Sequence, residues 1–217
     1  MHSMNLKILT CVGGAIQLPS PALVLVDRAD GGNLIVTPPR RVWERSELLP
    51  AELTRWSFLV AAAGKAMLET LPQLDGGCIN YWEAGNWSLH DDAEPRGPKI
   101  PRGSRHVHLH LLGRSRDARD PSWRWGEAPK FPDFRDRYAW ARPFKRLAAD
   151  ECRAITGAVR NILSLTYGFR PEEISPSAEC TICGYPVPAL PGDPNTQCPE
   201  CHGRPQPRPS DRLEFRE

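Results

Sequence analysis

Long apolar runs are missing from this sequence. No stretch approaches the roughly 20 consecutive apolar residues that a membrane-spanning helix needs, so we expect no membrane segment. The amino end, residues 4–12, lacks the long apolar run and the small-residue cleavage site of a secretory signal. These absences argue against an integral membrane protein and against a secreted one.

The chain also has little net charge and an odd number of cysteines. Its formal net charge is only +2, and complete pairing of its seven cysteines would leave one over. Four of the cysteines lie in two Cys-x-x-Cys units, which are more typical of a metal site than of a disulfide framework. Reduced, metal-binding cysteines indicate a cytoplasmic protein, and this is the location we expect.

Three histidines occur in one short alternating pattern. His106, His108 and His110 alternate with Val107, Leu109 and Leu111. Because alternate side chains of a strand point to opposite faces, the pattern predicts a strand that buries its aliphatic row and presents three imidazoles together. Three interpretations fit: a metal site, a polar sheet face without chemistry, and phosphoryl chemistry in which an unprotonated imidazole attacks phosphorus.

Basic residues surround the histidines. Between residues 95 and 120 the seven basic side chains exceed the acidic ones by five. Guanidinium groups form forked hydrogen bonds to phosphate oxygens, so this concentration favours a polyanionic ligand. A solvated basic loop is the alternative for any one of them. The seven are Arg96, Lys99, Arg102, Arg105, Arg114, Arg116 and Arg119.

The segment from His106 to Leu112 resembles the signature of the histidine triad family, in which three histidines alternate with apolar residues before a further apolar residue. Upstream segments at residues 22–27, 31–42 and 48–53 are similar in order and spacing to a strand, a second strand and a following helix of that family. The resemblance covers about residues 5–115. Histidine at the third position resembles the hydrolase branches more than the galactose-1-phosphate uridylyltransferases.

This resemblance implies an α+β fold, with a helix packed on one face of an antiparallel sheet, and an enzyme that cleaves at the α-phosphate of a nucleotide, for which we expect adenine. The substrate would be a nucleoside phosphoramidate or a dinucleoside polyphosphate, and a nucleoside monophosphate would be released. By the same resemblance, His108 forms a nucleotidyl-histidine, His110 helps to move the leaving-group proton, and His106 orients the strand. This chemistry requires no metal.

Further contacts follow from the resemblance. It implies that Asp27 accepts the ribose hydroxyls and that Asn80 helps to hold phosphate; a turn cap and a strand-end amide are the respective alternatives. The chain departs from the family before the first histidine, where residues 101–105 replace a compact Gly-Gln segment, and at Asn33, where many members have another histidine. The expected substrate-binding residues are Asp27, Asn33, Asn80, Arg102, Ser104 and Arg114.

Two other functions fit the same residues. A triad domain followed by a zinc module resembles the aprataxin branch, which removes adenylate from nucleic-acid ends, although the finger there uses two cysteines and two histidines. Alternatively, the protein could be a non-catalytic nucleotide-sensing adaptor. For the nucleotide hydrolase or transferase, the family resemblance implies a homodimer formed by joining sheets.

The hydrophobic pattern predicts the main elements. Strands are expected at residues 6–12, 22–27, 33–37 and 78–82, with Asp30-Gly31-Gly32 as a hairpin turn between the second and the third. Apolar residues recur every three or four positions over residues 50–71 and again over 150–167, which predicts two helices.

Two Cys-x-x-Cys units, with fourteen residues between Cys183 and Cys198, suit a closed tetrahedral zinc site. We expect a structural Zn²⁺ in a zinc-ribbon module. A redox pair, disulfides, or His202 replacing Cys201 as ligand are alternatives. The expected ligands are Cys180, Cys183, Cys198 and Cys201.

The expected organisation has four parts. Residues 1–118 form the nucleotide-binding catalytic domain, 119–172 a Trp- and Pro-rich loop with a helix, 173–203 the zinc ribbon and 204–217 a flexible tail. Trp123, in the second part, is expected either to stack on a base or to pin the loop onto the core, as is Trp125.

Overall fold

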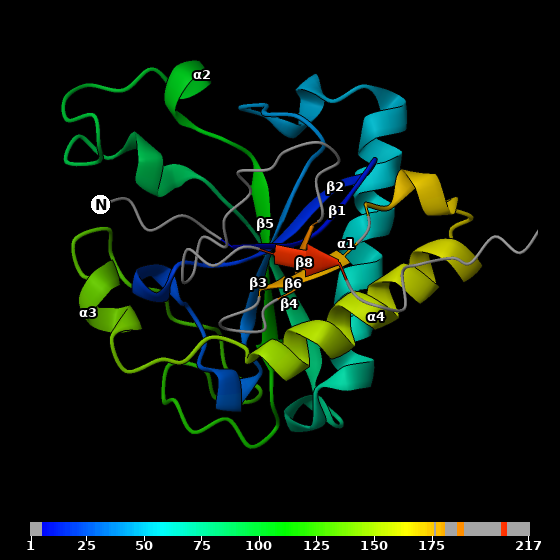
Figure 1. Cartoon of the computed structure of the whole chain (residues 1–217). Helices are drawn as coiled ribbons and strands as arrows, with labels where there is room; N and C mark the ends of the chain where they lie inside the picture. The colour runs from blue at the N-terminus through cyan, green and yellow to red at the C-terminus, as the bar shows by residue number, and fades with distance from the viewer. Residues whose placement is uncertain (1–5, 176, 181–185, 189–204, 208–217) are drawn as a thin grey trace, which may run out of the picture.

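The fold is α+β and centres on one antiparallel sheet. The computed structural model describes residues 6–175, 177–180, 186–188 and 205–207. Five strands lie in the order β1-β2-β3-β5-β4 (Figure 1), and every neighbouring pair is antiparallel. The strands are β1 (Leu6–Cys11), β2 (Gly14–Leu18), β3 (Asn33–Thr37), β4 (Cys78–Ala84) and β5 (His108–Arg114).

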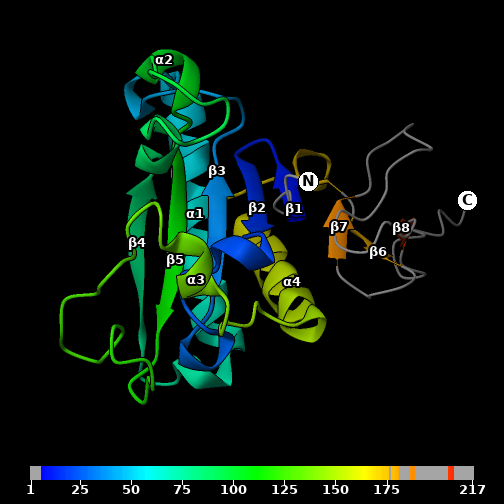
Figure 2. The same ribbon diagram turned by 90° about the vertical axis from the view of Figure 1, so that its left-hand side faces the viewer.

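Two long helices pack together on one face of this sheet (Figure 2). They are α1 (Pro50–Thr70) and α4 (Ala149–Leu165), and both confirm the helices predicted from periodicity. Pro50 occupies the first turn of α1, where its missing N–H has no partner to lose. The short helices are α2 (Pro101–Ser104) and α3 (Arg137–Ala141), with 3₁₀ turns η1 (Pro21–Leu23), η2 (Arg28–Asp30), η3 (Arg45–Glu47), η4 (Pro72–Leu74), η5 (Asn86–Leu89) and η6 (Pro171–Glu173).

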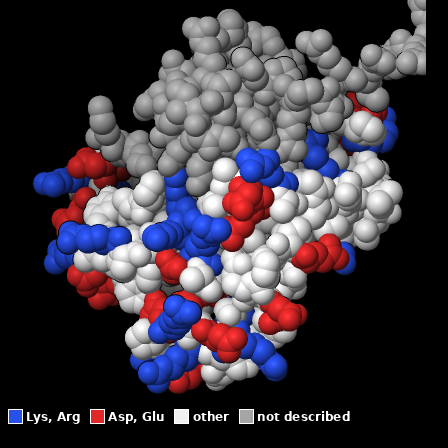
Figure 3. Space-filling model, turned by 60° about the horizontal axis from the view of Figure 1, so that its bottom comes forward, with Lys and Arg blue, Asp and Glu red and all other residues white. Residues whose placement is uncertain are grey.

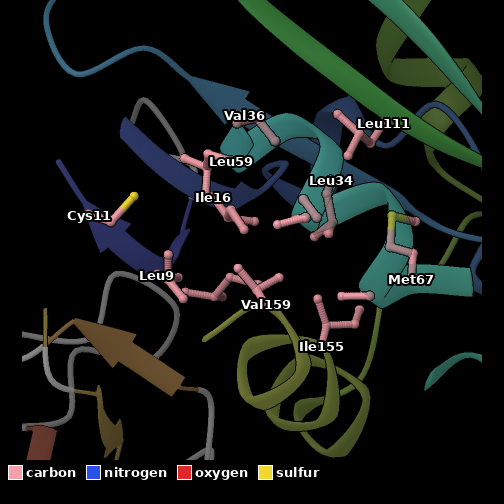
Figure 4. Packing of buried hydrophobic residues seen from close by; sticks show 14 of the residues in the cluster. Leu9, Cys11, Ile16, Leu34, Val36, Leu59, Met67, Leu111, Ile155 and Val159 are labelled. Atoms are coloured by element: carbon pink, nitrogen blue, oxygen red, sulfur yellow. The ribbon is translucent and has the colours of Figure 1, made fainter. Parts of the chain in front are cut away.

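The main core lies between the sheet and these two helices. Figure 4 shows strand side chains, among them Leu34 and Leu111, meeting Met67 of α1 and Val159 of α4. All four are fully buried. Since α4 shares this core with α1, residues 149–165 are part of the same packed unit as the sheet.

The opposite face of the sheet is covered by loops. Leu25 and Val26 pack against Leu112 and Trp123 in a second apolar cluster. The Trp123 indole Nε1 donates a hydrogen bond to the carbonyl of Gly113 at 2.8 Å, so this side chain pins its loop to β5 as expected. Trp125, in contrast, is 40% exposed and lies under the Arg116 guanidinium. This covered face is the one toward which the histidines of β5 point.

The predicted strand at residues 22–27 is wrong. The second strand is instead β2, which follows β1 through a tight turn where Gly14 adopts φ +129°. Residues 21–23 form η1, and Val24, Leu25 and Val26 run on as buried loop. Their apolar character reflects packing onto the sheet face, where Leu25 and Val26 belong to the second apolar cluster. The predicted Gly31-Gly32 turn therefore leads from η2 into β3 and joins no two strands.

The other strand predictions hold with shifted ends. Strand β4 pairs with β5 along its length, with Trp82 opposite His110 and Asn80 opposite Leu112. Strand β5 begins at His108, so His106 lies just before the regular ladder.

A second antiparallel sheet contains β6 (Ser177–Cys180), β7 (Pro186–Pro188) and β8 (Pro205–Pro207) in the order β7-β6-β8, and β7 lies beside β1 (Figure 2). Of the predicted zinc ligands, Cys180 ends β6, whereas Cys183, Cys198 and Cys201 lie outside the described residues. The zinc site therefore stays a prediction. Within the described residues, none of the helices is both long and apolar enough to cross a membrane.

Candidate functional site

All three histidines line one cavity on the loop-covered face of the sheet. The cavity has a volume of about 430 Å³, which is within the range of small-ligand pockets. His106, His108 and His110 share its lining with Trp82, Glu83 and other residues of the β4 region. The alternating sequence pattern thus brings the imidazoles together as predicted.

The backbone just before β5 is held against the loop that follows β3. The N–H of Val107 donates to the carbonyl of Val42 at 3.0 Å, and both side chains are buried in the main core. This hydrogen bond places Arg41, the residue before Val42, beside His106. It thereby connects two segments that are far apart in sequence at the mouth of the cavity.

The ring of His108 has a defined hydrogen-bonding state. Its Nδ1 lies 2.8 Å from the carbonyl oxygen of His106. A carbonyl only accepts, so Nδ1 carries the proton and the neutral ring keeps an unprotonated Nε2. His108 therefore presents the nitrogen lone pair that a nucleophilic imidazole requires.

His110 is the innermost of the three and contacts Asn33. The Asn33 side chain accepts a hydrogen bond from the Leu25 N–H at 3.3 Å and donates one to the Leu34 carbonyl at 3.0 Å, which fixes its amide orientation. Its Nδ2 then lies 3.4 Å from Nδ1 of His110. Because Nδ2 can only donate, Nδ1 of His110 accepts, and the ring proton of the neutral imidazole is on Nε2.

His106 lies at the edge of the cavity, against Arg41. The Arg41 Nε donates to Nδ1 of His106 at 2.9 Å, and the guanidinium also touches the other ring nitrogen. His106 lines a second, smaller cavity of about 270 Å³ as well, together with Arg41 and Arg102. The ring therefore stands between two adjoining spaces.

The surroundings keep all three imidazoles neutral at pH 7. Burial lowers the pKa of His110 to about 3, with His108 adding to the effect. Burial also lowers the pKa of His108, aided by Arg105 and opposed by the hydrogen bond to the His106 carbonyl and by Glu83. The pKa of His106 is lowered by burial and then by the positive charge of Arg41. A neutral ring has the lone pair that nucleophilic attack needs. In the resting protein, none of the three rings is an imidazolium that could give a proton to a leaving group.

Aromatic side chains form another wall of the cavity. Trp82 stacks on Phe131 with ring centroids 4.3 Å apart and an angle of 10° between the planes, and it lies 5.5 Å from the ring of His110. Trp87 lines the same space. The sequence reasoning missed these residues. Trp82 was detectable, because it stands on the same strand face as Asn80, but Phe131 comes from a loop that no local pattern connects with β5.

Three predicted contact residues do not line this cavity: Asp27, Asn80 and Asn33, the last of which is buried against His110. Asp27 lines a separate space of about 1040 Å³ that contains none of the triad histidines. Its carboxylate accepts from the N–H groups of Ala29 at 2.8 Å and Lys145 at 2.7 Å, so it caps a turn, which was the alternative interpretation. Asn80 is outside the cavity lining, two residues along β4 from Trp82.

The predicted phosphate contacts divide in the same way. Ser104 lines the histidine cavity, and Arg102 lines the adjoining smaller one, where it pairs with Glu47 at 2.6 Å. Arg114 is buried and its guanidinium donates to the carbonyls of Arg124 and Glu127. Arg114 thus holds a loop and does not reach the histidines.

The basic residues around the triad do not converge as a group. Arg105 is anchored to Glu44 and to the Trp43 carbonyl, Arg96 lies near Glu94, and Lys99 donates to the carbonyl of Ala93. At the lower end of the view in Figure 3, acidic side chains lie among the basic ones. Support for an anionic ligand therefore comes from individual basic residues beside the histidines. One of them, Arg41, was not predicted from the sequence. Its signal was the basic pair after Pro38 and Pro39.

The metal interpretation of the histidine row gains no support from the side-chain arrangement. Within the part of the chain that the structure describes, no three His, Cys, Asp or Glu side chains gather in a way that could hold a metal ion. The Nδ1 atoms of His108 and His110 face protein groups.

Neither the protein-family models nor the curated protein sequences contain a match to this chain. Its function is therefore argued from the site itself.

Proposed function

We propose that this protein is a histidine triad nucleotide hydrolase or nucleotidyl transferase that cleaves at an α-phosphate through a nucleotidyl-histidine intermediate. The observation that supports it best is the hydrogen bond from His108 Nδ1 to the His106 carbonyl, which leaves an unprotonated Nε2 on a ring that lines a cavity. The lowered pKa of His108 keeps this nitrogen unprotonated at neutral pH.

The reaction proceeds in two displacements. The Nε2 lone pair of His108 attacks the α-phosphorus, an N–P bond forms, and the bond to the leaving group breaks with its electron pair. A phosphate leaves as the anion, whereas an amine takes up a proton from water. Water then attacks the same phosphorus and releases a proton to the solvent, the N–P bond breaks, and a nucleoside monophosphate is released while His108 regains its lone pair. Dividing one difficult displacement into two is the advantage of covalent catalysis.

His110 serves in this mechanism as a hydrogen-bond donor. With Nδ1 accepting from Asn33, its Nε2–H can donate to a phosphoryl oxygen as negative charge develops there. Because the pKa of His110 is about 3, almost none of this side chain is imidazolium at neutral pH, and it does not act as a proton donor. The role expected from the family resemblance, help in moving the leaving-group proton, is thus narrowed to charge stabilisation.

The aromatic wall favours a nucleotide with a planar base. Trp82, Trp87 and Phe131 give flat apolar surfaces within the cavity that holds the histidines. Aromatic rings bind bases by stacking, and an adenine nucleotide is the ligand we propose.

We also propose that the enzyme is a homodimer formed through β4. This strand is an edge strand of the sheet, and its Tyr81 is 51% exposed. An outer strand offers unpaired backbone groups to a second copy. A monomer mass in light scattering at micromolar concentration would contradict the dimer.

The test is release of AMP from adenosine 5′-phosphoramidate by the full chain. Wild-type protein should release AMP, and H108N should reduce the rate by far more than the roughly 10²–10⁴-fold that loss of an acid–base group costs. H90N is the matched control, because His90 stacks on Phe134 and is not part of the cavity lining. Binding of the substrate without turnover would instead favour the nucleotide-sensing adaptor.

A further inference from the structure

Beside His106 lies the positively charged side chain of Arg41, which is not paired with a carboxylate among the described residues. Arg41 has no carboxylate within salt-bridge distance among the described residues, and the contact its guanidinium makes there is with His106. The neighbouring Arg40, by contrast, donates from Nε to both carboxylate oxygens of Glu52, at 2.9 and 3.1 Å. A guanidinium carries five N–H donors, and a neutral imidazole can satisfy only one of them.

The small cavity that Arg41 lines is positively charged. Its charged lining consists of Arg41, Arg102 and Glu47, and the pKa of His106 is lowered so that this ring adds no charge. Glu47 is already engaged by Arg102 at 2.6 Å. One positive charge is therefore left over in a space of about 270 Å³, next to a ring that also borders the nucleophile's cavity.

We propose that this cavity is a subsite for a second phosphate, the one joined to the α-phosphate in the leaving group. The inference rests on the proposed function and specifies it: the substrate is a phosphoanhydride and its leaving group is anionic. Arg41 binds the second phosphate and Arg102 lies at the outer side of the same space. His106 stands between the two phosphates, where its contact with Arg41 positions the guanidinium.

The balance of the step explains why a cation is needed there. When the P–O bond breaks, the leaving phosphate takes the electron pair and gains one negative charge. His110 cannot supply a proton at neutral pH, so stabilisation by a fixed cation replaces proton transfer. A phosphate leaving group needs no proton to depart, whereas the amine of a phosphoramidate does.

Two substrate classes share this chemistry. A dinucleoside polyphosphate has a second phosphate after the attacked one, and so does an adenylated 5′-phosphate end of a nucleic acid. A phosphoramidate has none. The subsite therefore predicts a preference for both anhydrides over the phosphoramidate, and a direct comparison of the two anhydrides identifies the source.

The experiment compares R41Q with R40Q in the full chain. Steady-state rates are measured with adenosine 5′-phosphoramidate, diadenosine tetraphosphate and a 5′-adenylated oligonucleotide. A hydrogen bond to a charged group contributes about 1.5–3 kcal/mol, so R41Q should lower kcat/KM for the anhydrides by about 10–100-fold. R41Q should lower the rate with the phosphoramidate less than the rates with the two anhydrides, and R40Q should leave the rates with all three substrates within about twofold.

Binding to the H108N variant separates this inference from the proposed function. In that background R41Q should weaken diadenosine tetraphosphate about 10–100-fold and leave AMP unchanged. Equal losses for AMP and the tetraphosphate, or no loss for either, would overturn the subsite. Turnover of the phosphoramidate alone by wild-type protein would also overturn it while leaving the proposed function intact. If R41Q weakens the tetraphosphate and not AMP, but the wild-type protein turns over none of the substrates, the subsite is supported and the proposed catalysis is overturned.

Discussion

Replacing Asn33 by Asp should reverse the tautomer of His110. In the wild type, Asn33 Nδ2 donates to Nδ1 of His110, and the amide is held by the Leu25 N–H and the Leu34 carbonyl. A carboxylate at this position accepts only, so Nδ1 of His110 would become the donor. Nε2 would then lose its proton, and the cavity would lose the hydrogen bond that stabilises the developing charge.

The magnitude follows from the loss of one fixed donor. Removing a single donor of this kind typically costs about 10²–10³-fold in kcat. Because the Asn33–His110 contact is long, at 3.4 Å, we expect the lower end, about 10²-fold. The new negative charge should also raise the pKa of His110 from its wild-type value of about 3.

The assay combines kinetics with ¹⁵N NMR of the imidazole nitrogens. In wild-type protein at pH 7, Nε2 of His110 should be the protonated nitrogen, and in N33D it should be Nδ1. The double variant N33D/H110Q should be no slower than H110Q alone, since both changes remove the same donor. Protonation of Nδ1 in the wild type, or an unchanged kcat in N33D, would refute the reasoning.

Three further predictions concern stability and metal content. His110 has a pKa of about 3 in the folded protein and about 6.5 in the unfolded chain, so the unfolded chain binds more protons between these pH values. The free energy of unfolding should therefore decrease by up to about 1.4 kcal/mol for each unit by which pH is lowered from 6.5 to 3. Urea unfolding should show this slope, and H110Q should flatten it. G31A should lower the free energy of unfolding by more than about 3 kcal/mol, because the new Cβ would lie 2.4 Å from the Gly113 backbone. G97A, at a residue that also has positive φ but lies in open space, should lower it by about 1 kcal/mol. Equal losses of stability in the two variants would contradict the contact. Purified protein should hold one zinc per chain by elemental analysis, and C183S should lose it; retention of full zinc would exclude Cys183 as a ligand.

The sequence was most informative where a periodic pattern faced a single core. The stripe over residues 50–71 predicted α1 within one residue, and the alternating histidines predicted three imidazoles that lie together. In both patterns the spacing of the side chains determines which of them share a face of the helix or strand, and the apolar face is the one that is buried. The same logic failed at residues 22–27, where an apolar run packs onto the sheet as a loop without joining it.

The parts of the site that were missed depend on contacts between distant segments. Phe131 reaches Trp82 from a loop 49 positions further along the chain, and Arg41 reaches His106 across 65 positions. The Asp27 carboxylate, which we expected at a ribose, accepts hydrogen bonds from the backbone N–H groups of Ala29 and Lys145. A side chain's type limits its possible bonds, but the partner that satisfies it is chosen by the tertiary structure.

Direct trapping of the covalent intermediate tests the central claim, that Nε2 of His108 is the nucleophile. Full-length protein is mixed with diadenosine tetraphosphate and with adenosine 5′-phosphoramidate, both labelled at the α-phosphate, and is quenched in alkali during turnover. We predict label on wild-type protein that is stable in alkali, lost in acid as expected for an N–P bond, located on the peptide that contains His108, and missing from H108N. Rapid turnover without label on the wild type, or equal labelling of H108N, would contradict it.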